Sequence, residues 1–195
     1  MNKLRIATIA GLLSLAASPA FAHVGLHADG TASGLLHPFS GLDHVLAMVA
    51  VGLFAARLGG RALWAVPASF VGVMMLGGAL GYSGLALPYV EPAIALSVIA
   101  MGALLAFEIR LKVPAAMALV GGFALFHGHA HGAEGAHLQS FAGYAAGFVV
   151  ATTLLHVAGI GLGLALEKGG ARIGAWGRRG AGLVGCVAGA MLLAG

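Results

Sequence analysis

The sequence predicts an all-α membrane protein, a polytopic bundle of six transmembrane helices that follows a cleaved signal peptide. Three observations support this fold class. Of the 195 residues, 60% are apolar and only 8% are charged, whereas soluble domains average about 25% charged residues. Long apolar stretches recur between short polar breaks, and the basic residues gather in alternate breaks. This composition excludes a water-soluble globule, and it excludes a disordered chain, which requires low hydrophobicity.

The first 22 residues have the layout of a secretory signal peptide. A basic start, Met1–Arg5, precedes the apolar run Ile6–Ala17, and Ala20-Phe21-Ala22 matches a small-x-small cleavage pattern. The alternative is a retained first transmembrane helix. We favour cleavage because an apolar run of roughly 12–15 residues is short for a span, which needs about 20. The predicted domains are therefore a signal peptide at 1–22 and a single transmembrane domain at 23–195.

Six apolar stretches downstream are close to the length of membrane spans, which is roughly 17–25 residues, except that the last is shorter. They cover residues 36–56, 62–82, 90–109, 113–133, 140–166 and 180–195. All basic residues of the mature chain fall in the breaks after the first, third and fifth stretches: Arg57, Arg61, Arg110, Lys112, Lys168, Arg172, Arg178 and Arg179. The positive-inside rule places those breaks in the cytoplasm and both mature termini outside it.

Several function classes are excluded by what the sequence lacks. Its ten basic residues are scattered and form no basic patch, so despite a pI near 9.7 we expect no nucleic-acid partner. No GxxxxGK[ST] phosphate loop is present, which excludes transport driven by ATP hydrolysis in this chain. The 33 glycines are expected to serve helix packing, through spacings such as Gly143-xxx-Gly147, Gly159-xxx-Gly163 and Gly185-xxx-Gly189.

The first span opens with a run of polar residues, His37-Pro-Phe-Ser-Gly-Leu-Asp43-His44, and continues to Met48. Ionisable residues within a span are costly, so they indicate function by default. On one continuous helix, His37, Gly41, His44 and Met48 form a stripe flanked by Asp43, with His44 roughly 10 Å deeper than His37. Gly41 would leave open space on that stripe. This pattern favours a path for a cation, although decoration of a helix at the membrane interface, with His37 only capping it, is the simpler alternative.

The fourth span ends in a second polar run, Phe126-His-Gly-His-Ala-His-Gly-Ala-Glu134. If this run is helical, His127, His131 and Glu134 share one face and His129 points away. The predicted topology places this face at a depth comparable to that of the first run. Its glycines leave the helix uncertain, and a broken helix end or an exposed histidine-rich loop that binds metal casually are the alternatives.

Imidazole and carboxylate ligands with almost no thiol suit a borderline divalent ion such as Ni²⁺, Co²⁺, Zn²⁺ or Cu²⁺ better than Ca²⁺ or Mg²⁺. The candidate metal ligands are His37, Asp43, His44, His127, His131 and Glu134. Further candidates for the path are Met48, His129, His156 and His23. His156 lies in the fifth span, where it either relays the metal or forms a hydrogen bond between helices.

The two polar runs resemble the signatures of a known family, the HupE/UreJ family of nickel permeases. The first run is similar to the family motif HPxxGxDHxxxM and the second to FHGxAHGxE, and both matches are complete. The resemblance implies secondary uptake of Ni²⁺, or of Co²⁺, across a bacterial inner membrane for hydrogenase or urease maturation, with cytosolic metallochaperones as partners. It carries the family's functional role over to His37, Asp43, His44, His127, His131 and Glu134, and nothing to His129.

We therefore expect a multi-pass permease rather than an enzyme, with the metal ion as its substrate and no organic cofactor. His37, His131 and Glu134 would begin to strip water from the ion near the periplasmic face, and Asp43, His44 and His127 would form a deeper site. Uptake should weaken as the pH falls through the histidine range near 6.5. Three rivals are open: a carrier of haem b held by His44 and His127, a zinc enzyme in the membrane, and a metal-binding accessory protein or sensor that does not transport.

Overall fold

The computed structural model describes residues 30–195, and these residues form helices and no strand. The predicted signal peptide, its cleavage and the candidate ligand His23 lie outside the described residues. In chain order the helices are α2 Thr31–Leu36, the 3₁₀ helix η1 His37–Phe39, α3 Leu42–Leu58, α4 Ala62–Tyr82, α5 Val90–Ala106, α6 Val113–Gly135, α7 Phe141–Lys168 and α8 Ala171–Ala194.

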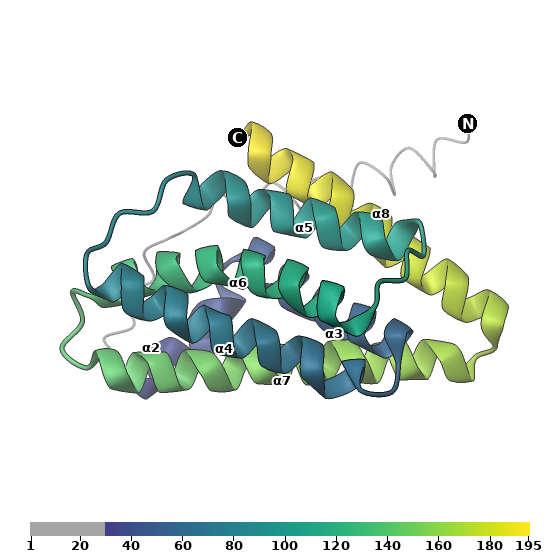
Figure 1. Cartoon of the computed structure of the whole chain (residues 1–195), viewed down its shortest axis with the longest axis horizontal. Coiled ribbons are helices and arrows are strands. Elements are labelled where there is room, and N and C mark those ends of the chain that lie inside the picture. The colour runs from purple at the N-terminus through teal and green to yellow at the C-terminus, as the bar shows by residue number, and fades with distance from the viewer. Residues whose placement is uncertain (1–29) are drawn as a thin grey trace, which may run out of the picture.

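The long helices run beside one another along the long axis of the molecule, and their connections lie at its two ends (Figure 1). One end holds the connections 82–90 and 135–141, and we call it the histidine end. The other holds the connections 58–62, 106–113 and 168–171, and we call it the arginine end (Figure 1). The basic residues Arg61, Arg110 and Lys112 lie in the connections of the arginine end, as the alternation in the sequence predicts.

Three helices, α4, α6 and α7, are long and apolar enough to cross a membrane, and α2–α3 would form a fourth, broken span. Helix α5 is also apolar but has only 17 residues. Large apolar side chains are exposed on the outside of the bundle, among them Trp64, Leu154, Val157, Val184 and Val187. In water such a surface would be unfavourable, whereas in lipid it is matched. The chain is a multi-pass membrane protein.

The prediction of one continuous helix through the first polar run is wrong. The chain bends by 83° between η1 and α3. Gly41 is extended at φ −109° and ψ 121°, so the helical hydrogen-bond ladder stops and α3 begins afresh at Leu42. Asp43 then lies in the first turn of α3, where a carboxylate interacts favourably with the helix dipole. His37 and His44 therefore belong to two different segments and do not share a helical stripe.

The last helix also differs from the prediction, because α8 begins at Ala171 and not near residue 180. It runs through Arg178 and Arg179, which the sequence places in a connection. The charged turn is stable as a helix because carboxylates neutralise it: Arg178 pairs with Glu108 at 3.0 Å and with Glu167 at 3.6 Å, and Arg179 pairs with Glu108 at 3.3 Å. With these arginines, α8 falls outside the helices apolar enough to count as candidate spans.

Glycines let pairs of helices pack backbone to backbone, as the spacings predict, and we call each line of such contacts a glycine seam. The closest seam joins α6 to α4: a Cβ at Gly128 would overlap the Met74 carbonyl oxygen, and one at Gly132 would overlap the Gly78 carbonyl oxygen. Backbones this close leave room only for glycine. Gly147 packs in the same way on α2, Gly159 on α3 and Gly189 on α5. The α6 seam matters most, because it fixes the helix that carries half of the candidate ligands.

Candidate metal site

Three segments deliver the candidate ligands to the histidine end of the bundle. His37 comes from η1, which is positioned by α2. A Cβ at Gly34 would overlap the Tyr144 carbonyl oxygen, so α2 lies directly on the backbone of α7. The ring of Tyr144 then contacts His37 edge-to-face, with 5.6 Å between the ring centroids. The position of His37 is therefore set by α7, more than 100 residues further along the chain.

Asp43 and His44 lie in the first turn of α3, directly after the bend. His44 Nδ1 is 2.9 Å from Asp43 Oδ1. The expectation that Gly41 leaves open space is wrong, because a Cβ there would lie 2.6 Å from Asp43 Oδ1 and 2.9 Å from His44 Nδ1. The missing side chain of Gly41 makes room for this hydrogen-bonded pair and not for a passing ion.

Helix α6 is continuous from Val113 to Gly135, so the predicted helical face exists and the exposed-loop alternative is wrong. His127 and His131 are buried on this face, at 0% and 5% exposed, and Glu134 extends from its last turn. The glycines between them, Gly128 and Gly132, face α4. The alternation of histidine and glycine in this run thus serves two faces, one for ligands and one for packing.

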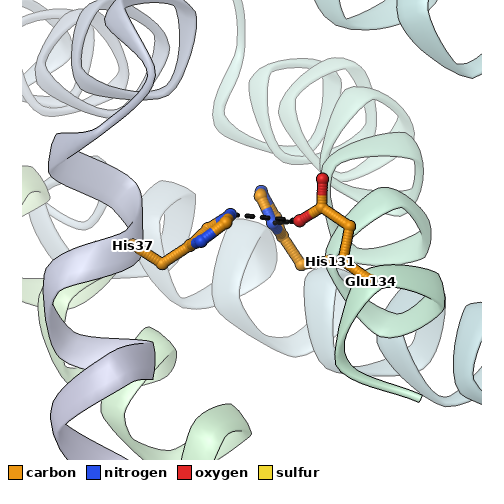
Figure 2. A group of neighbouring side chains, drawn as sticks. All are labelled: His37, His131 and Glu134. Carbon is orange, nitrogen blue, oxygen red and sulfur yellow. Dashed lines mark hydrogen bonds and ion pairs between the residues drawn. The ribbon is translucent and has the colours of Figure 1, made fainter. Parts of the chain in front are cut away.

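His37, His131 and Glu134 meet at the mouth of the site (Figure 2). Glu134 Oε2 lies 3.0 Å from His37 Nε2 and 3.1 Å from His131 Nδ1, so one carboxylate oxygen joins two segments. One potential ligand atom from each of the three residues lies within 4.8 Å of the others. The Glu134 side chain is 57% exposed and that of His37 is 33% exposed, so an ion in water can reach this group.

Deeper in the site, His131 and His44 face each other through their Nε2 atoms, which are 2.5 Å apart. A carboxylate can only accept a hydrogen bond from a neutral imidazole, so Glu134 fixes the proton of His131 on Nδ1, and Asp43 does the same for His44. Both Nε2 atoms then carry lone pairs directed at each other. Such an arrangement is favourable only with a cation between them, either a proton or a metal ion.

His127 is the most deeply buried residue of the site, at 0% exposed. Its ring contacts that of His44 with 5.1 Å between centroids. Its Nε2 is 2.9 Å from Ser97 Oγ, while the Ser97 hydroxyl donates its proton to the Ile94 carbonyl oxygen at 2.6 Å. Ser97 must therefore accept from His127, which leaves His127 Nδ1 with a lone pair and no partner among the described residues. Ser97 was not predicted, since a lone serine in an apolar stretch carries no signal of its own.

Three imidazoles thus have one nitrogen held by a hydrogen bond and the other free to accept. Histidines that ligate metals are almost always oriented in this way, with a carboxylate or another acceptor on the second nitrogen. The structure brings all six predicted ligands into one connected histidine cluster, defined as His37, Asp43, His44, His127, His131 and Glu134. That they bind metal stays a prediction.

The other candidates lie outside this cluster. Met48 is buried in the apolar core. His129 faces away, as expected, and its Nε2 is 2.6 Å from the Leu85 carbonyl oxygen. His156 lies beyond Phe70, whose ring contacts it with 4.9 Å between centroids. The hydrogen bond between helices that the sequence allows for His156 is not formed, because neither ring nitrogen has a partner among the described residues.

Fold and site together define a class, a multi-pass membrane protein with a buried histidine and carboxylate cluster near one end of its helix bundle. Comparison with known proteins makes this specific. Residues 11–192 match the family described as HupE / UreJ protein. The chain is also 57% identical over 162 residues to Protein HupE of Rhizobium leguminosarum bv. viciae, an alignment that covers 83% of this chain and 84% of that protein. The chain belongs to the HupE/UreJ family. No solved structure matches it.

Proposed function

We propose that this protein carries a divalent transition metal ion, Ni²⁺ in the first place and Co²⁺ as the nearest alternative, across the bacterial inner membrane by secondary transport. The observation that supports this most directly is the facing pair of His44 and His131. Their second nitrogens are held by Asp43 and Glu134, and their Nε2 lone pairs converge. A pair arranged in this way suits a cation between the two nitrogens, and in this proposal the metal ion takes that place.

The donor set favours a transition metal over other cations. Neutral imidazole nitrogens suit Ni²⁺, Co²⁺, Zn²⁺ and Cu²⁺, whereas Ca²⁺ and Mg²⁺ prefer oxygen ligands throughout. The two carboxylates, Asp43 and Glu134, supply the negative charge that a dication needs away from water. A metal ion bound by both His44 and His131 would sit about 2.0–2.1 Å from each nitrogen if it resembles zinc, so the two rings would move apart on binding.

The cluster is exposed at one end and buried at the other, which suggests where an ion first meets its ligands. The side chains of Glu134 and His37 are 57% and 33% exposed, that of His44 is 11% exposed, and His127 is fully buried. In this proposal Glu134 and His37 replace the first water ligands. His131, which contacts both Glu134 and His44, passes the ion to the deeper group of Asp43, His44 and His127.

The cellular setting is part of the same proposal. In this proposal α3 to α8 form six spans after a signal peptide cleaved at 1–22. The histidine end would then lie in the periplasm and the arginine end in the cytoplasm, as the positive-inside rule predicts. Uptake in this direction would supply metal for hydrogenase or urease maturation. Cytosolic metallochaperones would then receive the ion.

The geometry of the cluster weakens two rivals. A haem held by His44 and His127 needs a porphyrin between the two rings, but these rings are in direct contact. A zinc hydrolase needs a metal-bound water with a general base beside it, whereas both carboxylates of the cluster are already hydrogen-bonded to imidazoles that they orient. A binding protein that does not transport is the rival that experiment must separate.

The decisive experiment measures ⁶³Ni accumulation in cells that lack their own nickel importers. It compares this chain, the variant His44→Ala and the matched variant His137→Ala, an exposed histidine outside the cluster, at equal membrane expression. We expect uptake by the unmodified chain and by His137→Ala, and none above background by His44→Ala. Competition by excess Co²⁺, Zn²⁺ or Cu²⁺ ranks the metals. Nickel binding by the purified protein without any uptake would instead establish the accessory or sensor role.

A further inference from the structure

His156 is a buried histidine that the histidine cluster does not include. It is 1% exposed, and neither Nδ1 nor Nε2 has a hydrogen-bond partner among the described residues. An imidazole that is buried without a partner carries a desolvation penalty that apolar residues of similar size would avoid. Its presence therefore calls for a function that packing does not supply.

The backbone around His156 is held in place by the neighbouring helix. A Cβ at Gly52 of α3 would overlap the His156 carbonyl oxygen, and Gly159, one turn further along α7, packs against Val49. Helices α3 and α7 are thus in direct backbone contact at this residue and one turn beyond it. The imidazole extends from a rigid position.

Two side chains with potential ligand atoms, Thr152 and Met74, each lie one helical turn from the His156–Phe70 contact. Thr152 is one helical turn away on the same face of α7, and its Oγ1 lies 3.8 Å from Met74 Sδ. Phe70 and Met74 are likewise one turn apart on α4, and Phe70 contacts His156. The contacts Phe70–His156 and Thr152–Met74 therefore place His156, Thr152 and Met74 on adjoining turns of α7 and α4, where all three side chains are buried. They offer an imidazole nitrogen, a hydroxyl oxygen and a thioether sulfur.

This group lies further from the histidine end than the cluster does. His127 is eight residues from the end of α6, or about 12 Å, whereas His156 is fifteen residues from the start of α7, or about 22 Å. The ring of Phe70 lies between them, 5.7 Å from the ring of His127 and 4.9 Å from that of His156. The two histidines thus belong to separate sites and do not share one ion.

We propose that His156, with Met74 and Thr152, forms a second and weaker metal-binding position, which a divalent transition metal ion occupies after it leaves the histidine cluster. This inference rests on the proposed transport function. Imidazole and thioether are ligands that borderline and soft transition metals accept. The described residues of this position include no carboxylate, unlike the cluster with its two, so the ion is held less tightly, as release toward the far side requires.

The test compares two substitutions of similar volume. His156→Leu removes the atoms that could bind a metal ion, whereas His156→Met keeps one such atom, its sulfur. If residue 156 served packing alone, both substitutions would be tolerated about equally. His129→Leu is the matched control, since it removes another buried histidine. Among the described residues, the hydrogen-bond partner of His129 is the carbonyl oxygen of Leu85, which is an exposed residue. Each full-length protein is purified, checked for its unfolding temperature, and reconstituted into proteoliposomes.

Two quantities are measured with ⁶³Ni²⁺. The first is the lowest dissociation constant, from equilibrium dialysis, and the second is the rate of uptake into the proteoliposomes at saturating metal. We expect His156→Leu to keep the tight binding of the cluster but to lower the uptake rate by more than about tenfold. Removing a residue that only hydrogen-bonds to a metal ligand already costs about tenfold or more, and removing the ligand itself should cost at least as much. His156→Met should recover a measurable part of the rate, and His129→Leu should retain it.

Uptake by His156→Leu within about twofold of the His129→Leu rate, or equal loss in the Leu and Met variants, would overturn the second position and leave transport through the cluster intact. Absence of both binding and uptake in the unmodified protein is a different result, because it would reject the proposed function itself and the second position with it.

Discussion

The two ends of the bundle both carry acidic side chains, but they use them in opposite ways. At the histidine end, Asp43 and Glu134 each contact imidazoles, which are neutral bases. At the arginine end, Glu108 and Glu167 contact Arg178 and Arg179, which are permanent cations, and we call these four residues the arginine cluster. The first arrangement leaves imidazole lone pairs available to an ion, whereas in the second both oxygens of Glu108 already accept hydrogen bonds from guanidinium groups.

This difference shows that a carboxylate near the end of the bundle does not by itself make a metal site. Arg178 donates from Nη2 to Glu108 Oε1 at 3.0 Å, and Arg179 donates to the other oxygen of Glu108 at 3.3 Å. A dication would have to displace both guanidinium groups to bind there. The arginine cluster instead joins α5, α7 and α8 at the ends of three helices, which is a structural task.

The largest expected effect comes from removing one charge at each end. Glu134→Gln should lower the initial rate of ⁶³Ni uptake by roughly 10-fold to 100-fold, because Glu134 orients His131 and contacts His37. Glu108→Gln, the same change at the arginine end, should alter the rate per folded molecule by less than about twofold, because its oxygens are occupied by arginines. Equal losses in both variants would mean that the two ends do not differ in function.

A second effect concerns stability and should be confined to the arginine end. Arg178→Met leaves Glu167 without the ion pair and Glu108 with Arg179 alone. Removing one partner of a buried pair costs about 3–5 kcal/mol, and the partial exposure of both carboxylates reduces this to about 2 kcal/mol. The thermal unfolding midpoint in detergent should fall, and the nickel dissociation constant should not change.

Glu108→Gln combined with Arg178→Met tests the same point, because it removes both members of the pair. The double variant should be less destabilised than the sum of the two single variants, as expected for residues in direct contact. Additive losses would show that the pair contributes little to stability.

The smallest expected effect is a difference in pH response between the two ends. Metal ligands must be deprotonated, so uptake should fall as the pH is lowered into the acid range. At the arginine end, the hydrogen bond from Arg178 lowers the pKa of Glu108 below its ordinary value of 4.5. Its contribution to stability is therefore fully present above pH 4.5 and is lost only as the pH falls through that lowered pKa.

Uptake and the unfolding midpoint, measured on the same preparation from pH 8 to pH 4, separate these two responses. The variant Glu108→Gln should show a flatter loss of stability in acid, and its uptake should keep the same dependence on pH. A parallel decline of uptake and stability would attribute the pH response to unfolding and not to protonated ligands.

Much of the site could be predicted because its residue types are so unfavourable in a membrane. Histidine and carboxylate within apolar stretches have few explanations besides function. The spacing of His127, His131 and Glu134 also predicted a shared face, and the structure confirms it, since α6 is unbroken. The all-helical fold follows from the same composition, because each backbone polar group must be satisfied in lipid.

The errors arose where local pattern and tertiary contact disagree. Helical periodicity placed His37 above His44 on one stripe, yet contacts between α2 and α7 hold His37 on a separate segment. Arg178 and Arg179 suggested a connection, yet Glu108 and Glu167, distant in sequence, stabilise them within α8. Ser97 orients His127 from α5, a helix that carries no residue of the histidine cluster. None of these contacts leaves a local signal in the sequence.

The bend at Ser40–Gly41 makes chain length in this segment as strictly constrained as residue identity. In a straight helix, deleting one whole turn returns the following side chains to nearly their former direction. The two segments here meet at a bend of 83° and not on one helix axis. An insertion or deletion of any length between His37 and Asp43 therefore moves these two side chains apart. Homologous chains should therefore vary freely in the connections of the arginine end and keep one fixed count of residues here.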